Sequence, residues 1–163
     1  MVETKYTIIE AEKQLKAERT FNAPVDLVWR AWTHPVILDE WWAPKPFKAR
    51  TLHMDFTVGG YWLYAMDGPI EHTPYSKAEF LAIEPLKSYT GLDSFTDETG
   101  KAIDGMPKMH WQVTFEANGD TTNVTVVTTF EKMEDLQKIV EMGFKEGFAA
   151  AHGNLDDWFT ANL

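Results

Sequence analysis

Three side chains in this sequence are of types that could do chemistry together. His53 and Asp55 are two residues apart, so on a strand they would share one face and could bind a metal with a third group from elsewhere. Asp55 and Asp93 could act as acid and base if both pointed into an apolar cavity, where burial raises the pKa of a carboxyl group. The alternatives are a half-exposed polar histidine and hydrogen-bonded or surface carboxylates.

Motifs that mark most other active sites are absent from the sequence. It contains no phosphate-binding loop, no dinucleotide-binding fingerprint and no Gly-x-Ser-x-Gly segment of the serine hydrolase kind. The five histidines include no pair at metal-ligand spacing, and the lack of cysteine excludes disulfides, thiolate catalysis and cysteine metal sites. We therefore assign no catalytic residue, no metal and no cofactor, and an enzyme is the less favoured class.

The composition is that of one acidic domain, which we take to span residues 1–163. Apolar residues make up 44% of the chain and aromatic residues 13%, which excludes a disordered protein. The net charge of -10 argues against nucleic acid and anionic membrane as partners, because both need a basic surface. No segment resembles a signal peptide or could span a bilayer, so a cytoplasmic location is expected by default.

Apolar periodicity predicts the order strand, two short helices, six strands, long helix. Residues 1–13 show no clear pattern, and the first strand is expected at 14–21. A helix follows between Pro24 and Pro35. The remaining elements are a helix at 36–42 and strands at 47–56, 61–66, 75–83, 87–95, 109–116 and 122–130. Short connections favour an antiparallel sheet of about seven strands in an α+β fold, with residues 96–107 as a long loop that could form a lid.

The last helix is expected at about 133–160 and carries one apolar stripe, formed by Leu136, Val140, Gly143, Phe144, Gly147, Ala151, Leu155 and Trp158. Gly143 and Gly147 are unusual there, because each glycine costs about 1 kcal/mol relative to alanine in a helix interior. Close packing against a sheet and an unfilled volume that holds a ligand are two explanations of equal weight. In a third, Gly143 divides the helix into two pieces.

Short motifs along nearly the whole chain resemble one protein family. They include Phe21-Asn22-Ala23-Pro24, Trp29-Arg30-Ala31-Trp32, Trp41-Trp42-Ala43-Pro44, Asp55 with Gly59-Gly60, and Gly143-Phe144 with Gly147-Phe148. The sequence resembles the START-like (SRPBCC) superfamily and, within it, the family related to the C-terminal domain of the activator of heat-shock protein 90 ATPase. This resemblance implies a helix-grip fold, in which a curved antiparallel sheet wraps around a long C-terminal helix, with two short helices after the first strand.

The sequence departs from the family pattern at two places. Thr57 stands where members usually carry arginine, and no serine or threonine cap precedes the last helix, where Glu131, Lys132 and Met133 lie. Any role that depends on the arginine is therefore not transferred to this chain.

The leading functional hypothesis is a protein that binds a small apolar or aromatic, lipid-like molecule in a hydrophobic cavity between the sheet and the last helix. The resemblance implies this site, since members of the superfamily bind lipids, hormones and polyketides there. Many aromatic residues beside two helix glycines also favour a cavity. Tyr64, Asp93, His53 or Asn154 would orient the ligand. The candidate cavity-lining residues are Trp42, Phe47, Trp62, Tyr64, Met66, Tyr89, Asp93, Trp111, Phe115, Gly143, Gly147, Phe148 and Ala151.

Two other classes of function remain open. The family name suggests a module that interacts with a chaperone through its surface. A cyclase or dehydratase-type enzyme could use the same cavity. The sequence is compatible with a monomer or with a homodimer.

Overall fold

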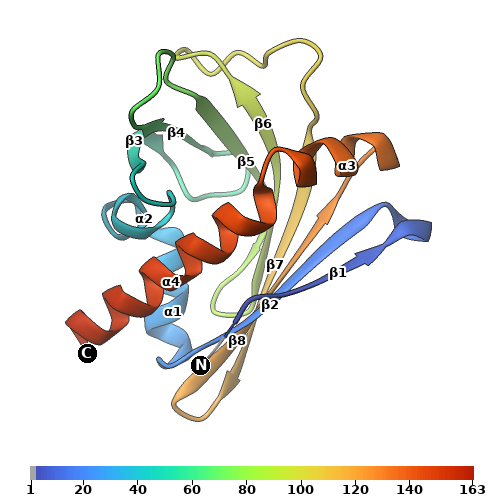
Figure 1. The fold of residues 1–163 in the computed structure, drawn as a ribbon. Coiled ribbons are helices and arrows are strands. Elements are labelled where there is room, and N and C mark those ends of the chain that lie inside the picture. Colours follow the sequence, from blue (N-terminus) through green and yellow to red (C-terminus); the bar gives the residue numbers. More distant parts are fainter. Residues whose placement is uncertain (1–2) are drawn as a thin grey trace.

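Eight antiparallel strands form one curved sheet in the computed structural model, which describes residues 3–163 (Figure 1). The order across the sheet is β1-β2-β8-β7-β6-β5-β4-β3. The strands are β1 (Lys5–Ile9), β2 (Gln14–Phe21), β3 (Lys48–Met54), β4 (Tyr61–Asp67), β5 (Tyr75–Glu84), β6 (Ser88–Thr96), β7 (Met109–Asn118) and β8 (Thr121–Thr129). The predicted α+β helix-grip fold with an antiparallel sheet is confirmed, and the sheet has one strand more than the approximate number expected.

The additional strand is β1, an edge strand that pairs with β2. No apolar alternation marks it in the sequence, because none of its residues is fully buried and Ile8 is 40% exposed. Between the two strands the chain makes a short 3-10 turn, η1 (Glu10–Glu12). An exposed edge strand needs little hydrophobic patterning, since backbone pairing on one side holds it in place.

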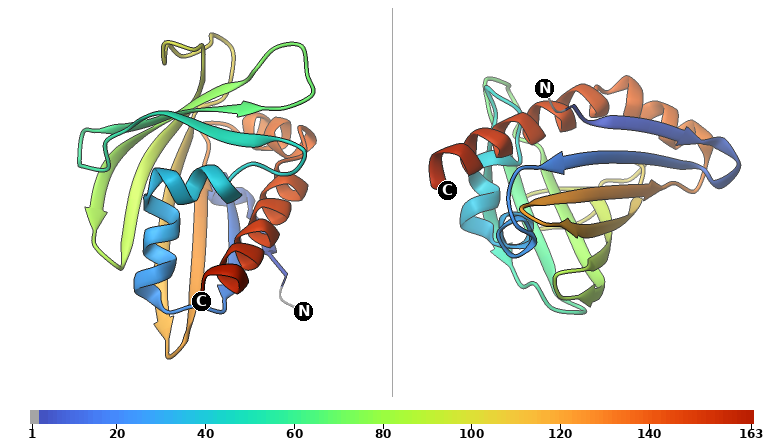
Figure 2. Two further views of the ribbon diagram at one scale, coloured as in Figure 1. Left: turned by 90° about the vertical axis from the view of Figure 1, so that its left-hand side faces the viewer. Right: turned by 90° about the horizontal axis from the view of Figure 1, so that it is seen from below.

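Four helices lie on the concave side of the sheet (Figure 2). The two short ones, α1 (Val25–Thr33) and α2 (Pro35–Trp41), follow β2 directly, and proline fixes the start of each. The C-terminal helices are α3 (Met133–Glu141) and α4 (Phe144–Asn162), and α4 crosses the concave face diagonally (Figure 1). None of the helices formed by residues 3–163 is long and apolar enough to cross a membrane.

Gly143 separates α3 from α4, so the prediction of one continuous terminal helix is wrong. The explanation in which Gly143 divides the helix into two pieces is the correct one for this glycine. Its φ is 93°, in the left-handed region where a side chain is strained. The N–H of Gly143 donates to the carbonyl oxygen of Val140 at 3.1 Å and so satisfies a carbonyl group at the end of α3.

This break changes which residues are buried beyond it. On α3 the fully buried residues are Leu136 and Ile139, while Val140 is half-buried. On α4 they are Phe148, Ala151, His152, Leu155 and Phe159. Trp158, which a continuous wheel places on the buried stripe, is only half-buried.

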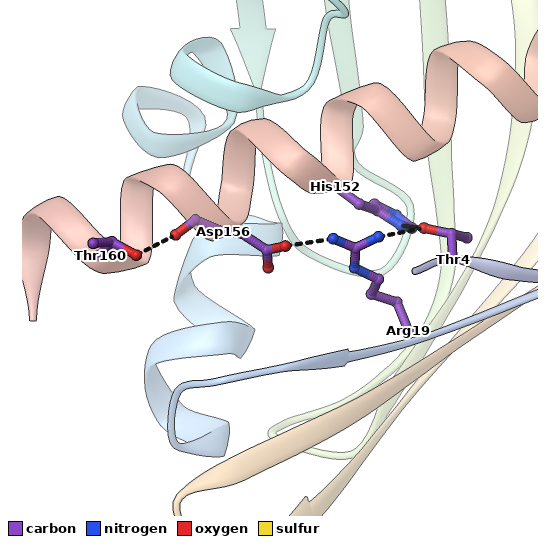
Figure 3. Close-up of polar contacts among 5 residues, drawn as sticks. All are labelled: Thr4, Arg19, His152, Asp156 and Thr160. Carbon is purple, nitrogen blue, oxygen red and sulfur yellow. Dashed lines mark hydrogen bonds and ion pairs between the residues drawn. The ribbon is translucent and has the colours of Figure 1, made fainter. Parts of the chain in front are cut away.

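A buried arginine ties the sheet to α4 (Figure 3). Arg19 lies on the concave face of β2, in an otherwise apolar row, and is 8% exposed. Its guanidinium forms an ion pair with Asp156 on α4 and donates to the hydroxyl oxygen of Thr4 at 3.1 Å. The Thr4 hydroxyl group lies 2.7 Å from Nδ1 of His152. This network joins the start of the chain, the second strand and the last helix.

Burial lowers the pKa of His152 to about 3, and the nearby charge of Arg19 adds to this effect. The histidine is therefore neutral at physiological pH. Because Thr4 accepts a hydrogen bond from Arg19, its hydroxyl proton is free to point at Nδ1. His152 then carries its proton on Nε2, which has no hydrogen-bond partner in residues 3–163. The imidazole ring lies among aromatic rings, and its centroid is 4.2 Å from that of Phe148.

We expect Asp156→Ala to lower the free energy of unfolding by about 1–3 kcal/mol, because it leaves Arg19 buried without its counter-ion. The loss stays below that for a fully buried pair, since the Asp156 side chain is 38% exposed. Denaturant unfolding monitored by tryptophan fluorescence measures this change. The matched control is Asp157→Ala, one residue along the same helix at an exposed position, with an expected effect within about 0.5 kcal/mol. Equal losses in both variants would show that the Arg19 pair contributes nothing special.

Candidate ligand-binding site

A cavity of about 390 Å³ lies between the concave face of β4–β7 and the junction of α3 and α4. The end of α2 and the loop between β4 and β5 complete its wall. Nine residues that the sequence analysis selected line it: Trp42, Phe47, Tyr64, Met66, Asp93, Trp111, Gly143, Gly147 and Phe148. Whether these residues bind a ligand stays a prediction, but their side chains or backbone line one common cavity that is open to solvent on one side.

The sheet side of the cavity follows from strand register. Tyr64 on β4 is paired with Ser76 on β5, and Asp93 on β6 is paired with Met109 on β7. Alternation puts all four on the concave face, with Trp111 two residues beyond Met109. The floor is therefore a mixed surface with one carboxyl group.

The helix side is formed by the first turn of α4. The rings of Phe144 and Phe148 stack with centroids 5.2 Å apart, and the Phe148 ring lies 5.6 Å from that of Trp111. At Gly147 an added Cβ would meet only Cγ of Pro44, at 3.7 Å, which is ordinary van der Waals contact. Close packing against the sheet therefore does not explain this glycine, whereas the space at the cavity wall does.

Hydrogen bonds from Asn154 hold the end of α2 in place beside this wall. Its side-chain N–H₂ donates to the carbonyl oxygens of Ala43 at 3.0 Å and Trp41 at 3.4 Å. The prediction that Asn154 orients a ligand is therefore not supported by its position, because it lies outside the cavity lining. Its contacts instead position the neighbouring Trp42, whose ring lies 5.9 Å from that of Phe148.

Four residues predicted to line the cavity lie elsewhere, and for two of them the cause is helix α1. Tyr89 and Phe115 share the concave face but pack on Trp29 of α1, at 6.0 and 5.0 Å between ring centroids. Trp62 stacks on Tyr64 at 4.1 Å and donates its indole N–H to the hydroxyl group of Thr51. Ala151 is 1% exposed and belongs to the packed core. The periodicity identified the correct face of each strand but not the half that α1 covers.

The sequence analysis missed other lining residues. Phe95 and Met109 follow directly from strand alternation, since each lies two residues from a residue that was selected, Asp93 and Trp111. Helix periodicity alone does not identify Ile139 and Met142, and no local signal identifies the loop residues. The complete set of missed residues is Pro44, Ile70, Pro74, Ser76, Ser94, Phe95, Met109, Ile139, Met142 and Phe144.

The polar loop 97–108 does not line this cavity, so the suggestion that it forms a lid is not supported. Its Gly100 is buried, and a Cβ added there would lie 3.7–3.9 Å from the side chains of Leu63 and Lys77. Both of these lie on the opposite face of their strands from the cavity residues Tyr64 and Ser76. The loop thus covers part of the convex face, which explains why β4 is apolar on both faces.

Asp93 is the one lining residue, among those the structure describes, that can carry a charge at neutral pH. Burial raises the pKa of Asp93 to about 8. The carboxyl group makes no hydrogen bond or ion pair with any of residues 3–163. Its cross-strand neighbours, Ala78 and Met109, have no donor to offer. Burial also raises the pKa of Tyr64, and the nearby carboxyl group of Asp93 raises it further.

In the described part of the chain, Asp55 is grouped neither with Asp93 in a cavity nor with His53 in a metal site, so the alternatives of an exposed polar histidine and a surface carboxylate hold for His53 and Asp55. Asp55 is exposed beyond the end of β3, where it accepts a hydrogen bond from the hydroxyl group of Thr57 at 3.0 Å. His53 is exposed as well, and the centroid of its ring lies 4.3 Å from that of Tyr61 in a tilted arrangement. It lies outside the cavity lining, so it cannot orient a ligand there. Within residues 3–163 no three histidine or acidic side chains are grouped so that they could hold a metal ion.

A curved sheet that encloses a long terminal helix, with an apolar cavity between them, defines a START-like helix-grip protein. Residues 22–160 match the family described as "Activator of Hsp90 ATPase homolog 1-like protein", and the chain belongs to this family. The structure gives a physical reason for one of the shared motifs. A Cβ at Gly60 would lie 2.2 Å from the carbonyl oxygen of Asp55, so a side chain has no room at the second glycine.

Solved structures of similar proteins have the same fold. A protein from Arthrobacter aurescens is 32% identical, with a TM-score of 0.87, and the alignment covers 93% of this chain and 88% of that one. Protein Ms6760 from Mycobacterium smegmatis is 28% identical, with a TM-score of 0.89 and coverage of 97% and 96%. A protein from Staphylococcus epidermidis is 27% identical, with a TM-score of 0.83 and coverage of 96% and 95%. Among proteins with curated descriptions, none matches.

The raised pKa of Asp93 predicts how stability depends on pH. The folded state holds this proton up to about pH 8, whereas the unfolded chain releases it near pH 4. Between these values the folded state binds more protons, so the free energy of unfolding falls as pH rises, by at most about 1.4 kcal/mol per pH unit from this group. Asp93→Asn removes this contribution, which denaturant titrations between about pH 5 and 8 measure.

The control for this experiment is Asp120→Asn, an exposed aspartate in the turn between β7 and β8. This variant should keep the pH dependence of the wild type. If Asp93→Asn and wild type show parallel pH profiles, the carboxyl group of Asp93 is ionised in the folded protein and the assignment is wrong.

Proposed function

We propose that this protein binds a small apolar or aromatic molecule in the cavity between the sheet and α4. The observation that carries the proposal is the cavity itself, about 390 Å³ in volume and walled by aromatic and aliphatic side chains. This volume lies within the range of about 300–1,000 Å³ of small-molecule sites. A molecule the size of a fused aromatic ring system matches it.

Apolar burial would provide most of the affinity, at roughly 25 cal/mol for each Å² removed from water. The rings of Trp42, Trp111 and Phe148 offer flat surfaces in edge-to-face and tilted arrangements with centroids 5.6–6.0 Å apart. Such a wall accepts aromatic and flat alicyclic bodies without requiring a particular hydrogen-bonding pattern. The polar side chains on the concave face of the sheet wall, Tyr64, Ser76 and Asp93, would orient the bound molecule.

The fold class supports this proposal in a general way. One protein of the same fold, DynU16, comes from the dynemicin biosynthetic locus. It is 19% identical, with a TM-score of 0.63, and the alignment covers 92% of this chain but 48% of that one. The likeness therefore concerns the fold, and the ligand of this chain has to be argued from its own cavity.

Filling the cavity from the helix side should strongly weaken the binding of an apolar probe. In Gly147→Leu the new side chain points back toward the first turn of α4 and occupies the space beside Pro44. We expect at least a roughly tenfold loss of affinity for the neutral probe N-phenyl-1-naphthylamine, measured by its fluorescence enhancement.

Gly153→Leu is the matched control, because this glycine lies on the same helix, outside the cavity lining, with open space around an added Cβ. It should retain the affinity of the wild type. Wild-type protein without saturable probe binding, or equal losses in both variants, would contradict the proposed site.

The two alternative classes of function stay predictions of lower weight. The chaperone module is supported by the family name, and saturable association with the 90-kDa heat-shock protein in a pull-down would test it. An acid–base enzyme would have to use Asp93 alone, since Asp55 lies outside the cavity.

A further inference from the structure

We propose that the ligand of this cavity carries a basic nitrogen, which binds as a cation between the carboxylate of Asp93 and the aromatic wall. This inference rests on the proposed function and adds the chemical class of the ligand. It concerns an amine or amidine attached to an apolar or aromatic body, since the rest of the wall is apolar.

The first argument is the missing partner of the Asp93 carboxyl group. Asp93 is half-buried, and a carboxyl group that is largely removed from water is normally hydrogen-bonded or paired with a cation, because leaving it alone is costly. Here the residues beside it in the sheet, Ala78 and Met109, have no donor, and no lysine or arginine reaches the cavity lining. A cationic N–H group from a ligand would supply what the protein does not.

The second argument is the arrangement of rings in the same wall. The ring of Trp42 lies 6.0 Å from that of Trp111 and 6.3 Å from that of Tyr64, and all three line the cavity together with Asp93. Aromatic faces attract cations, and a group of them beside a carboxylate is a preferred environment for an alkylammonium group. An anionic ligand would meet the carboxyl group of Asp93, which disfavours it.

The third argument is the overall charge. With a net charge of -10, the protein attracts cations and repels anions at a distance. A ligand that enters as a cation would be favoured before it reaches the cavity. The electrostatic field of the whole protein does not select one cation over another, but it favours cations just as the carboxyl group of Asp93 does.

Ionising Asp93 for such a pair costs little. Because the pKa of Asp93 is about 8, removing its proton at pH 7 lowers the affinity for a cationic ligand by only about tenfold. A bound amine would therefore displace this proton, and affinity would increase with pH up to about 8. The other titratable groups near Asp93 are the hydroxyl groups of Tyr64 and Tyr89, and burial raises the pKa of both, so they remain neutral. From β5, β7 and α4 the cavity receives no ionisable side chain.

Three probes with one aromatic body test the proposal: 2-(aminomethyl)naphthalene, 2-naphthalenemethanol and 2-naphthoic acid. Isothermal titration calorimetry at about pH 8 should show the amine bound at least roughly tenfold more tightly than the alcohol, with the carboxylate weakest. From about pH 6 to 8 the affinity of the amine should rise by up to about tenfold per pH unit, while that of the alcohol stays constant.

Asp93→Asn should remove both the preference for the amine and its pH dependence, while binding of the alcohol stays within about threefold. Asp120→Asn, which changes the net charge equally at an exposed turn, should behave like the wild type. If Asp93→Asn does not fold, the pH profile of the wild type decides the question by itself.

The outcomes separate this inference from the proposed function. Equal binding of amine and alcohol to the wild type overturns the inference and leaves the cavity as an apolar site. The inference is also overturned if the preference for the amine persists in Asp93→Asn. It is overturned as well if binding of the alcohol weakens above about pH 8, because the protonated carboxyl group of Asp93 would then be donating a hydrogen bond to the ligand. No binding by any of the three overturns both proposals.

Discussion

The structure depends on a mismatch of size between a wide curved sheet and the helices that must cover it. Eight strands about 4.8 Å apart make a concave face more than 30 Å wide, whereas a helix with its side chains is about 10–12 Å across. The helix α4 therefore covers only a band of that face. At one end α1 fills the remaining space with Trp29 and Trp32, which contact Phe115. At the other end, between β4–β7 and the junction of α3 and α4, the helices do not fill the space and a cavity remains.

Polar contacts along the helix and a left-handed residue before it hold α4 in the position that leaves this space. The pair of Arg19 and Asp156 joins it to β2, Asn154 joins it to the end of α2, and Gly143 sets the angle at which it leaves α3. Each of these devices is costly without its partner, since each places a polar group or a left-handed backbone conformation inside the domain. They fix one position of the helix among those that apolar packing alone would allow, because such packing is not directional.

The carboxyl group of Asp93 is a polar group in the cavity wall that the stability of the fold does not require. An alanine or valine there would match its neighbours Ala78 and Met109, and the fold would be more stable without an unpaired acid. Costs of this kind concentrate at functional sites. This unpaired acid lies in the wall of the main cavity and not at random in the core.

Much of the fold could be predicted from the sequence, because its elements depend on local patterns. β7 alternates between buried and exposed residues from Met109 to Glu116, and α1 and α2 begin at prolines. β1 was missed because an exposed edge strand carries no such pattern. The single terminal helix was predicted in one piece because a glycine inside a regular stripe does not reveal its own φ angle.

For the site, the sequence determined which residues face the concave side, because strand alternation and side-chain type are local properties. Tyr64, Asp93 and Trp111, which it selected, line the cavity, and it placed Tyr89 and Phe115 on the same face without being able to separate them. Only the tertiary structure decided which half of that face remains open. The position of α1, the bend at Gly143 and the path of the loop between β4 and β5 are fixed by contacts between segments far apart in the chain, and no local pattern encodes such contacts.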